Sequence, residues 1–261
     1  MDINLPLILM VAVVFTGVVW LIDALFLKPR RSDDQTEPVV VEYSKSFFPV
    51  LAVVFVLRSF LLEPFKIPSE SMVPTLEVGD FIVVNKFAYG IRLPVFRTKV
   101  IPISDPQRGD VVVFFPPHED RYFIKRMVAG PGDTVSFRDN TLYLNGSPVG
   151  EELIGVDYTP RREIRCLNGE YQLFNEMIGG IEHLMRRCST SQGLGHDQTW
   201  EVPEGHYFMV GDNRDNSADS RSSQWVQGAF VPDKNIVGKA FGIWMHWDEG
   251  LPSFSRAGAI N

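Results

Sequence analysis

The hydrophobic positions of this 261-residue chain are concentrated near its N-terminus. An uncharged apolar run extends from Leu5 to Ile22 and resumes after Asp23 as far as Leu27, which is long enough for a helix to cross a membrane. A cleaved signal peptide is the alternative interpretation, but no Lys or Arg precedes the run and no small-residue cleavage site follows it. The pattern predicts a first transmembrane helix within residues 1–27.

A second, shorter apolar run covers Phe47 to Leu62 and contains Arg58. A buried helix of a soluble domain would have a similar pattern. Arg58 lies close to the C-terminal end of the run, however, where its long side chain can reach the lipid headgroups. We therefore expect a second transmembrane helix over residues 47–62, joined to the first by a polar linker over residues 28–46.

Basic residues set the expected orientation of the two helices. No Lys or Arg precedes the first run, whereas several lie in the linker. Because Lys and Arg favour the cytoplasmic side of a membrane, we expect the linker in the cytoplasm and both the N-terminus and residues 63–261 on the outer side. The basic linker residues are Lys28, Arg30, Arg31 and Lys45.

Residues 63–261 alternate between short apolar runs and turn signals, a pattern typical of β-strands. Thr134–Phe137 and Thr141–Leu144, for example, flank Asp139–Asn140 and predict a hairpin. A helical period is recognisable only around Asn175–Met185. We expect a mainly β fold: an antiparallel β-sheet domain with few helices, preceded by the two transmembrane helices. The other expected strands are 80–84, 111–115, 122–128, 207–210 and 236–244.

Residues 151–199 are polar and irregular, and they contain both cysteines, Cys166 and Cys188. In an oxidising compartment the two can form a disulfide worth about 3 kcal/mol, whereas in the cytosol they would be free thiols. They form no Cys/His metal motif. The formal net charge of −7 provides no basic surplus for neutralising phosphates, so we expect no nucleic-acid partner.

Conventional catalytic motifs are missing from the sequence. None of the five histidines lies in a recognisable nucleophile or zinc motif. The acidic stretch Asp212–Asp219 lacks the glycine and the distal glutamate of a calcium loop. We therefore expect neither a His-based triad nor a metal site, and serine and lysine remain as candidates for the reactive groups.

Ser71 is the first of these candidates and follows Leu62 by nine residues. Pro64, Pro68 and Pro74 stiffen the backbone around it. A straight chain of nine residues reaches at most about 30 Å, so Ser71 is expected close to the bilayer. A polar loop without a catalytic role is the alternative interpretation of this stretch.

Lys125 is the second candidate. Alternate residues of a strand share a face, so Lys125 would lie beside the apolar Phe123 and Met127 while Arg126 points the other way. An unperturbed lysine is only about 0.04% neutral at pH 7, and burial on an apolar face lowers its pKa toward the range that a general base requires. A lysine whose charge reaches water from a sheet edge is the alternative.

Four segments resemble the conserved boxes of bacterial type I signal peptidases, also called leader peptidases, which are Ser-Lys dyad serine proteases. The segments occur in the order of that family and follow two membrane segments with the family's orientation. The segment starting at Gly211 is highly specific, and those containing Ser71 and Lys125 are each moderately specific. The four segments are Pro68–Leu76, Gly109–Phe114, Phe123–Arg126 and Gly211–Arg221.

The resemblance implies a role for each matching residue. Ser71 corresponds to the nucleophile and Lys125 to the general base, and the Ser71 N–H and the Ser69 hydroxyl correspond to the donors that stabilise the oxyanion. The residues that match the lysine-orienting hydroxyl and a supporting ion pair are Ser217, Asp219 and Arg221. The residues that match the lining of the small apolar substrate pockets are Ile67, Pro68, Met72, Leu76, Phe123 and Ile124.

The resemblance also implies an activity: removal of N-terminal signal peptides from exported preproteins after small residues, typically Ala-X-Ala, with no metal or cofactor. The expected partners are secretory preprotein signal peptides, the lipid bilayer and, transiently, the protein-export machinery. The expected location is a bacterial inner membrane, with the catalytic domain on the periplasmic side. The alternatives are a non-catalytic membrane-tethered β-domain that binds or assembles other proteins, and a Ser-Lys self-cleaving regulator, which the two membrane segments disfavour.

Three features depart from the family pattern. Glu70 occupies a position where many members have glycine, and Phe123 replaces a common tyrosine. Cys166 and Cys188 are farther apart than the close pair of enterobacterial members. The resemblance therefore leaves open whether these two cysteines are paired.

Overall fold

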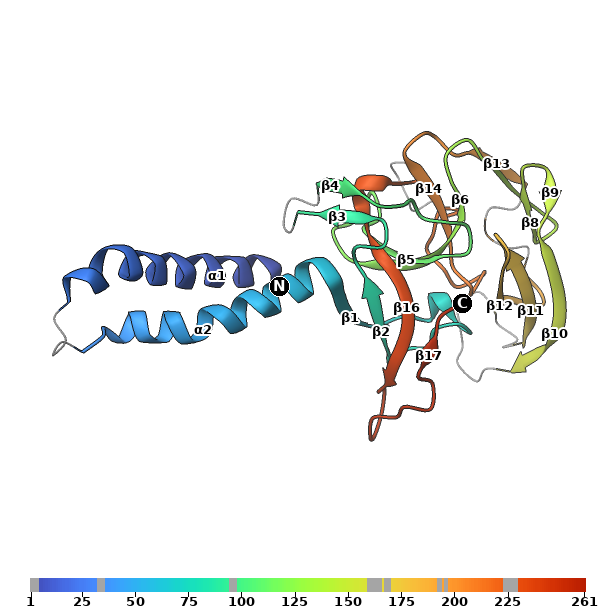
Figure 1. Cartoon of the computed structure of the whole chain (residues 1–261). Coiled ribbons are helices and arrows are strands. Elements are labelled where there is room, and N and C mark those ends of the chain that lie inside the picture. Colours follow the sequence, from blue (N-terminus) through green and yellow to red (C-terminus); the bar gives the residue numbers. More distant parts are fainter. Residues whose placement is uncertain are drawn as a thin grey trace.

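The structure is a computed structural model and describes residues 5–31, 36–93, 98–158, 166, 170–191, 194, 197–222 and 230–261. Two long helices form an antiparallel hairpin that projects from a β-rich domain, and the second helix leads directly into the first strand (Figure 1). The predicted fold, a mainly antiparallel β domain preceded by two apolar helices, is confirmed.

The second helix begins earlier than the apolar run predicts. Helical backbone starts at Val39, within the region expected to be a linker, because Pro38 provides the extended residue before the helix and apolar valines follow it. Pro49 is tolerated inside this helix. The helical segments are α1 (Leu5–Ile22), a π-helical turn (Asp23–Leu27), a 3₁₀ turn (Lys28–Arg30), α2 (Val39–Val56) and a second π-helical turn (Leu57–Leu61).

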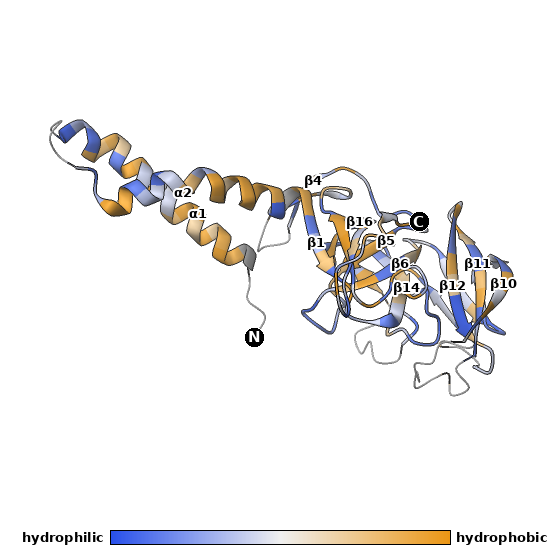
Figure 2. Cartoon of the chain, turned by 90° about the horizontal axis from the view of Figure 1, so that it is seen from below, coloured by the Kyte–Doolittle hydropathy of each residue, from blue (hydrophilic) through white to orange (hydrophobic). Residues whose placement is uncertain are grey.

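Both helices are long and apolar enough to cross a membrane. Many of their hydrophobic side chains are exposed, and Figure 2 shows hydrophobic residues along much of each helix. The helices approach each other at Gly17, where an added Cβ would lie 2.8 Å from the Phe48 ring. Trp20 packs on the same ring, with centroids 5.4 Å apart. The membrane boundaries within residues 1–62 and the side that each end faces remain predictions.

The β domain is built around one large sheet. The strands are β1 (Leu62–Lys66), β2 (Asp80–Asn85), β3 (Gly90–Arg92), β4 (Lys99–Pro102), β5 (Val111–Phe114), β6 (Phe123–Ala129), β7 (Thr134–Arg138), β8 (Thr141–Leu144), β9 (Ser147–Pro148), β10 (Gly150–Tyr158), β11 (Glu170–Ile178), β12 (Ile181–Cys188), β13 (Gln198–Glu201), β14 (His206–Val210), β15 (Val231–Pro232), β16 (Ile236–His246) and β17 (Gly258–Ala259). In the described part of the chain, the large sheet has the order β1-β2-β16-β5-β6-β14-β15, with β17 paired to β16. Smaller sheets are β3-β4, β13-β7-β8-β9 and β10-β11-β12 (Figure 1).

The helical period read around residues 175–185 is wrong, because this stretch belongs to the hairpin of β11 and β12. Gly179 and Gly180 form its two-residue turn with φ of 61° and 81°, and Ile178 pairs with Ile181. Turns of this kind match the twist of paired strands and require residues that tolerate positive φ. The apolar spacing suits a helix or a strand, and the double glycine decides in favour of the hairpin.

The two cysteines, which the sequence left open, form a disulfide. Cys166 and Cys188 have Cα atoms 5.4 Å apart and are both buried against Tyr171. Cys188 is the last residue of β12, so the bond ties the segment before β11 to the end of this hairpin.

A buried carboxylate fixes the end of the helix hairpin to the large sheet. β1 starts at Leu62, directly after the π-helical turn, and the next residue, Glu63, is 3% exposed. Its two carboxylate oxygens accept hydrogen bonds from Arg58 Nη2 at 3.4 Å and from Lys86 Nζ at 3.0 Å. Lys86 Nζ also donates to the Arg58 carbonyl at 3.3 Å. Glu63 therefore joins the helix end to β1 and to the residue that follows β2.

Candidate active site

Ser71 lies in a short 3₁₀ turn, Glu70–Met72, that follows β1. The approach to this turn is fixed against β2. The Ile67 N–H donates to the Asp80 carbonyl at 2.8 Å, and the Ile67 carbonyl accepts from the Gly79 N–H at 3.0 Å. These bonds hold the proline-rich segment in place, and Ser71 is turned into the domain with 8% of its surface exposed.

Lys125 lies in β6, an interior strand of the large sheet, and meets Ser71. Its Nζ donates to Ser71 Oγ at 2.6 Å and to the Ile124 carbonyl at 2.7 Å. Only 3% of Lys125 is exposed, and its Nζ lies 5.5 Å from the centre of the Phe123 ring, as the alternation along the strand predicts. The structure thus brings together the two residues that the sequence singled out.

The surroundings of Lys125 lower its pKa to about 8. Burial is the main cause because it disfavours the charged form, and the nearby Arg221 acts in the same direction. Asp219 and Asp212 oppose this effect. A lysine with this pKa is neutral in about a tenth of the molecules at pH 7, and a neutral amine in this place can accept the proton of the Ser71 hydroxyl.

Two groups beside Ser71 can donate to a developing oxyanion. The Ser69 hydroxyl lies on the exposed side of the site, 3.3 Å from Ser71 Oγ. Ser71 is the second residue of its 3₁₀ turn, and the first N–H groups of a helix have no acceptor within that helix. The Ser71 N–H and the Ser69 hydroxyl are therefore both available as donors close to Ser71 Oγ.

Asp219 and Arg221 form the expected ion pair. Two hydrogen bonds join them, Nη2 to Oδ2 at 2.8 Å and Nε to Oδ1 at 3.0 Å, and both residues are buried. Burial raises the pKa of Asp219, but Arg221 and the hydrogen bonds lower it below its usual value overall. The Ser217 hydroxyl is buried beside Asp219 and contributes to this lowering. Within the described residues, no hydrogen bond of regular geometry joins Ser217 to Lys125.

The segment starting at Gly211 packs directly on the turn that carries the serine. The Asn213 N–H donates to the Ser71 carbonyl at 3.2 Å, and Asn213 Nδ2 donates to the Glu70 carbonyl at 3.1 Å. A Cβ at Gly211 would collide with the Ser71 carbonyl and with the Ser217 hydroxyl. Glycine is therefore required at position 211 because the two segments approach so closely.

The six residues that the resemblance assigns to substrate pockets fall into two groups. Pro68 is exposed and Phe123 is half-buried, so both are accessible from solvent. The other four pack in the core on one side of the large sheet, and Met72 and Leu76 are fully buried. The core group is Ile67, Met72, Leu76 and Ile124.

Sequence reasoning missed a buried cluster of charges next to the dyad. Asp212 accepts two hydrogen bonds from Arg126, at 2.9 and 2.7 Å, and one from Thr75 Oγ1 at 2.5 Å. Burial raises the pKa of Asp212, but Arg126 outweighs this and holds it below its usual value. Arg126 and Asp212 lie inside the motif segments, and this position is the one sequence feature that points to them. Glu176 and His183, which extend the cluster, lie outside every motif.

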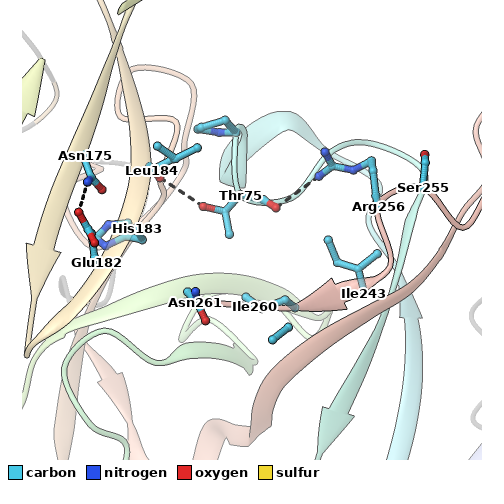
Figure 3. Close-up of a pocket in the computed structure, with 12 residues that line it drawn as sticks. Thr75, Asn175, Glu182, His183, Leu184, Ile243, Ser255, Arg256, Ile260 and Asn261 are labelled. Carbon is cyan, nitrogen blue, oxygen red and sulfur yellow. Dashed lines mark hydrogen bonds between the residues drawn. The ribbon is translucent and has the colours of Figure 1, made fainter. Parts of the chain in front are cut away.

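A pocket of about 610 Å³ adjoins this cluster, between β12, the serine-bearing segment and the residues around β17 (Figure 3). Thr75 reaches across one side of it, and its hydroxyl, which donates to Asp212 over the shorter distance, also lies 3.2 Å from the Leu184 carbonyl. His183 forms part of the same wall. The lining includes none of the six residues assigned to substrate pockets, so this cavity is separate from them.

Comparisons with known proteins agree with the motif segments. Residues 40–247 match the family described as signal peptidase, peptidase S26. A solved structure of a signal peptidase I from Enterococcus faecalis V583 is 28% identical, covers 52% of this chain and 97% of its own, and has a TM-score of 0.30. We base the assignment on the sequence matches and not on this superposition.

Two curated relatives align over the whole chain. Signal peptidase I of Pseudomonas aeruginosa is 49% identical, and signal peptidase I of Pseudomonas fluorescens is 47% identical. In each case the alignment covers 100% of this chain and 100% of the relative. The chain therefore belongs to the peptidase S26 family of signal peptidases.

Proposed function

We propose that this chain is a membrane-bound serine endopeptidase that removes signal peptides from exported preproteins, with Ser71 as the nucleophile and Lys125 as the general base. Family membership supports a serine peptidase acting on this class of substrate. The observation that carries the assignment of residues is the 2.6 Å contact between Lys125 Nζ and Ser71 Oγ in a buried, apolar environment.

In the first step, neutral Lys125 accepts the Ser71 hydroxyl proton while Ser71 Oγ attacks the scissile carbonyl carbon. The Ser71 N–H and the Ser69 hydroxyl donate to the oxyanion, and one such donor is worth about 3 kcal/mol. The tetrahedral intermediate then breaks its C–N bond. Lys125 returns the proton to the leaving amine, which releases the mature protein and leaves the signal peptide as an ester on Ser71.

In the second step, a water molecule attacks the ester carbonyl and gives a proton to Lys125. The same two donors stabilise the second oxyanion. When the C–O bond to Ser71 breaks, Lys125 protonates the serine oxygen. The signal peptide leaves as a carboxylate, and both residues return to their starting protonation states.

The edge of β6 next to Ser71 is the proposed place for the substrate. β14 pairs with β6 from Arg126 to Ala129, so it does not cover the preceding residues of β6. An extended peptide can add a strand at this uncovered edge, a common mode of peptide recognition. Pro68 and Phe123 are accessible from solvent, and we propose that they contact the substrate residues at which the Ala-X-Ala preference is set.

The proposed location is an inner membrane, crossed by α1 and α2, with the catalytic domain on the periplasmic side. The basic residues between the helices support this orientation. The Cys166–Cys188 disulfide supports it as well, because disulfides persist in oxidising compartments. The proposed partners are preprotein signal peptides, the bilayer and, transiently, the export machinery.

A cleavage assay on a purified preprotein, with the full chain in detergent, tests the dyad. Ser71→Ala and Lys125→Ala are each expected to lower kcat/KM by about 10³-fold or more, because the nucleophile or its base is lost. Lys66→Ala, which removes an exposed lysine of β1, is the matched control and is expected to cleave normally. Cleavage at the normal rate by either dyad variant would sink the assignment.

The alternative, a non-catalytic membrane-tethered β-domain, makes the opposite prediction for the same variant. It requires Ser71→Ala to retain full function in cells, since no covalent chemistry would depend on the hydroxyl. Membership of a peptidase family and the buried contact between serine and lysine favour the enzyme.

A further inference from the structure

The proposed mechanism does not use Glu176, a fully enclosed carboxylate of the small sheet β10-β11-β12. Its Oε2 forms an ion pair with Arg214 Nη2 and lies 3.1 Å from His183 Nε2. Burial raises the pKa of Glu176, but Arg214 and His183 outweigh it and lower the pKa to about 2. Glu176 is therefore ionised at neutral pH, and it contacts two buried partners at once.

The first partner leads to the ion pair beside the lysine. The Arg214 side chain forms the ion pair with Glu176, and the Arg214 backbone carbonyl accepts a hydrogen bond from Arg221 Nη2 at 2.8 Å. Arg221 forms its two hydrogen bonds with Asp219. Asp219 is the carboxylate with the largest opposing effect on the pKa of Lys125. A displacement of Arg214 would therefore be felt at Asp219.

The second partner leads to the serine-bearing segment. His183 Nε2 lies 3.8 Å from Asp212 Oδ1. Asp212 binds Arg126, the neighbour of Lys125 in β6, and Thr75, four residues after Ser71. Figure 3 shows His183 and Thr75 at the wall of the pocket, reaching it from different segments.

Both routes end at the same place. Asp219 and Asp212 are the two carboxylates that raise the pKa of Lys125 against the effect of burial. Glu176 is connected to Asp212 through His183, and to Asp219 through Arg214 and then Arg221. We propose that Glu176 is a positioning residue for the catalytic base: it fixes Arg214 and His183, and through them the two carboxylates that face Lys125. The proposal rests on the proposed function of Ser71 and Lys125.

The competing explanation is that backbone hydrogen bonds alone hold the segment with Asp212 and Asp219 in place. The Arg186 N–H donates to the Asp212 carbonyl, and the Arg214 N–H donates to the Arg186 carbonyl, both at 2.9 Å. β12 would hold the segment to some extent without Glu176. The test must therefore change the side-chain charge and leave the backbone in place.

Glu176→Gln makes this change in the full chain, because glutamine has the same shape without the charge. We expect kcat on a preprotein to fall about 10- to 100-fold, as small displacements of catalytic groups do, with KM within about twofold. The acid limb of the kcat/KM profile should move to lower pH. Loss of the Glu176 charge and a looser Asp219 both remove negative potential near Lys125, which otherwise faces Asp219, Asp212 and Arg221.

Glu151→Gln is the matched control. Glu151 belongs to β10 of the same sheet and forms an ion pair with Arg187 at 2.9 Å. Its charge also acts on Arg214 through space, but within the described residues no hydrogen bond joins it to Arg214, Asp212 or Asp219, so it does not hold them in place. We expect wild-type kcat, KM and pH profile for this variant. Equal losses in Glu151→Gln and Glu176→Gln would overturn the proposal, because the effect would then belong to the sheet as a whole.

A second variant guards against simple unfolding, because Glu176→Gln leaves the buried Arg214 without its ion pair. Glu176→Leu combined with Arg214→Met removes both charges, an exchange that proteins often tolerate. A wild-type melting temperature with a slow kcat and a shifted acid limb supports positioning. A wild-type melting temperature with wild-type kcat and pH profile overturns it. Neither result depends on whether Ser71→Ala abolishes cleavage, so the two proposals fail separately.

Discussion

Two regions of the molecule bury charged groups in opposite ways. In the large sheet, Lys125 is buried beside apolar groups, and its pKa falls to about 8. In the small sheet β10-β11-β12, Glu176 is buried against two cationic or polar partners, and its pKa falls to about 2, so its charge is retained. Burial makes a charged group reactive only where its partners do not offset the loss of hydration. Compensated groups maintain geometry instead.

Two glycines, one from each region, provide the comparison with the largest expected effect. Gly211→Ala forces a Cβ against the Ser71 carbonyl and the Ser217 hydroxyl, and a displacement of the nucleophile is expected to lower kcat about 100-fold. Gly155→Ala in β10 meets open space and should cleave at the wild-type rate. Steady-state kinetics on a preprotein measure both. Equal activity of the two variants would show that the close approach at Gly211 is unimportant.

The pH dependence of cleavage should follow Lys125. Below its pKa of about 8 the lysine is protonated and cannot act as a base, so kcat/KM is expected to rise about tenfold per pH unit and to level off above pH 8. A pH–rate profile of the wild type measures this. A limb that levels off near pH 6 would contradict the assignment of Lys125 as the titrating base.

The free energy of unfolding should rise with pH in two separate windows, one for each region. The pKa of Lys125 is lower in the folded chain than its ordinary value of 10.5, so the unfolded state binds more protons and the free energy of unfolding rises as pH increases through about 8 to 10.5. Glu176 stabilises above its ordinary pKa of 4.5 and loses this contribution as pH falls toward 2. Denaturant unfolding of the wild type, Lys125→Met and Glu176→Gln separates the two contributions.

The disulfide should give the smallest effect on catalysis. Cys166→Ser with Cys188→Ser removes a cross-link in the small-sheet region, and the expected loss in the free energy of unfolding is about 3 kcal/mol. Because Cys188 ends β12 and Cys166 lies before β11, away from the strand and the turn that carry Lys125 and Ser71, kcat is expected to stay within about twofold below the melting temperature. Thermal unfolding and cleavage of the same sample provide the test. A large fall in kcat with little change in stability would extend the positioning role to this bond.

The large sheet and the pair of residues Ser71 and Lys125 are predictable from the sequence because their signals are local. Apolar alternation and turn residues mark the strands, and Ser71 and Lys125 lie in motif segments. The alternation does not say which apolar side chains face a substrate, and Met72 and Leu76, which the resemblance assigns to pockets, are fully buried in this structure. A resemblance transfers the role of a position, but only the packing shows whether that side chain is accessible.

The small sheet was less predictable because its organisation depends on distant residues. Glu176 and Arg214 are 38 positions apart in the sequence, and no local pattern predicts that they form a pair. The spacing of apolar residues around β11 and β12 also suited a helix, and only Gly179–Gly180 decides the turn. The start of α2 at Val39 was missed for a related reason: it depends on Pro38 and not on where the longer apolar run begins.

The Glu63 contacts at the end of α2 have a consequence for which bond of a substrate is cut. Since β1 follows the π-helical turn directly and Glu63 binds both Arg58 and Lys86, we expect these contacts to limit the motion of the β domain relative to the helix hairpin. The height of Ser71 above the bilayer is then a built-in length. We expect a signal peptide anchored in the same bilayer to present its cut site at that height, so that this distance would decide which bond is cut. A few flexible residues inserted between Leu61 and Leu62 would let the distance of Ser71 from the bilayer vary, and cleavage is then expected at several neighbouring bonds.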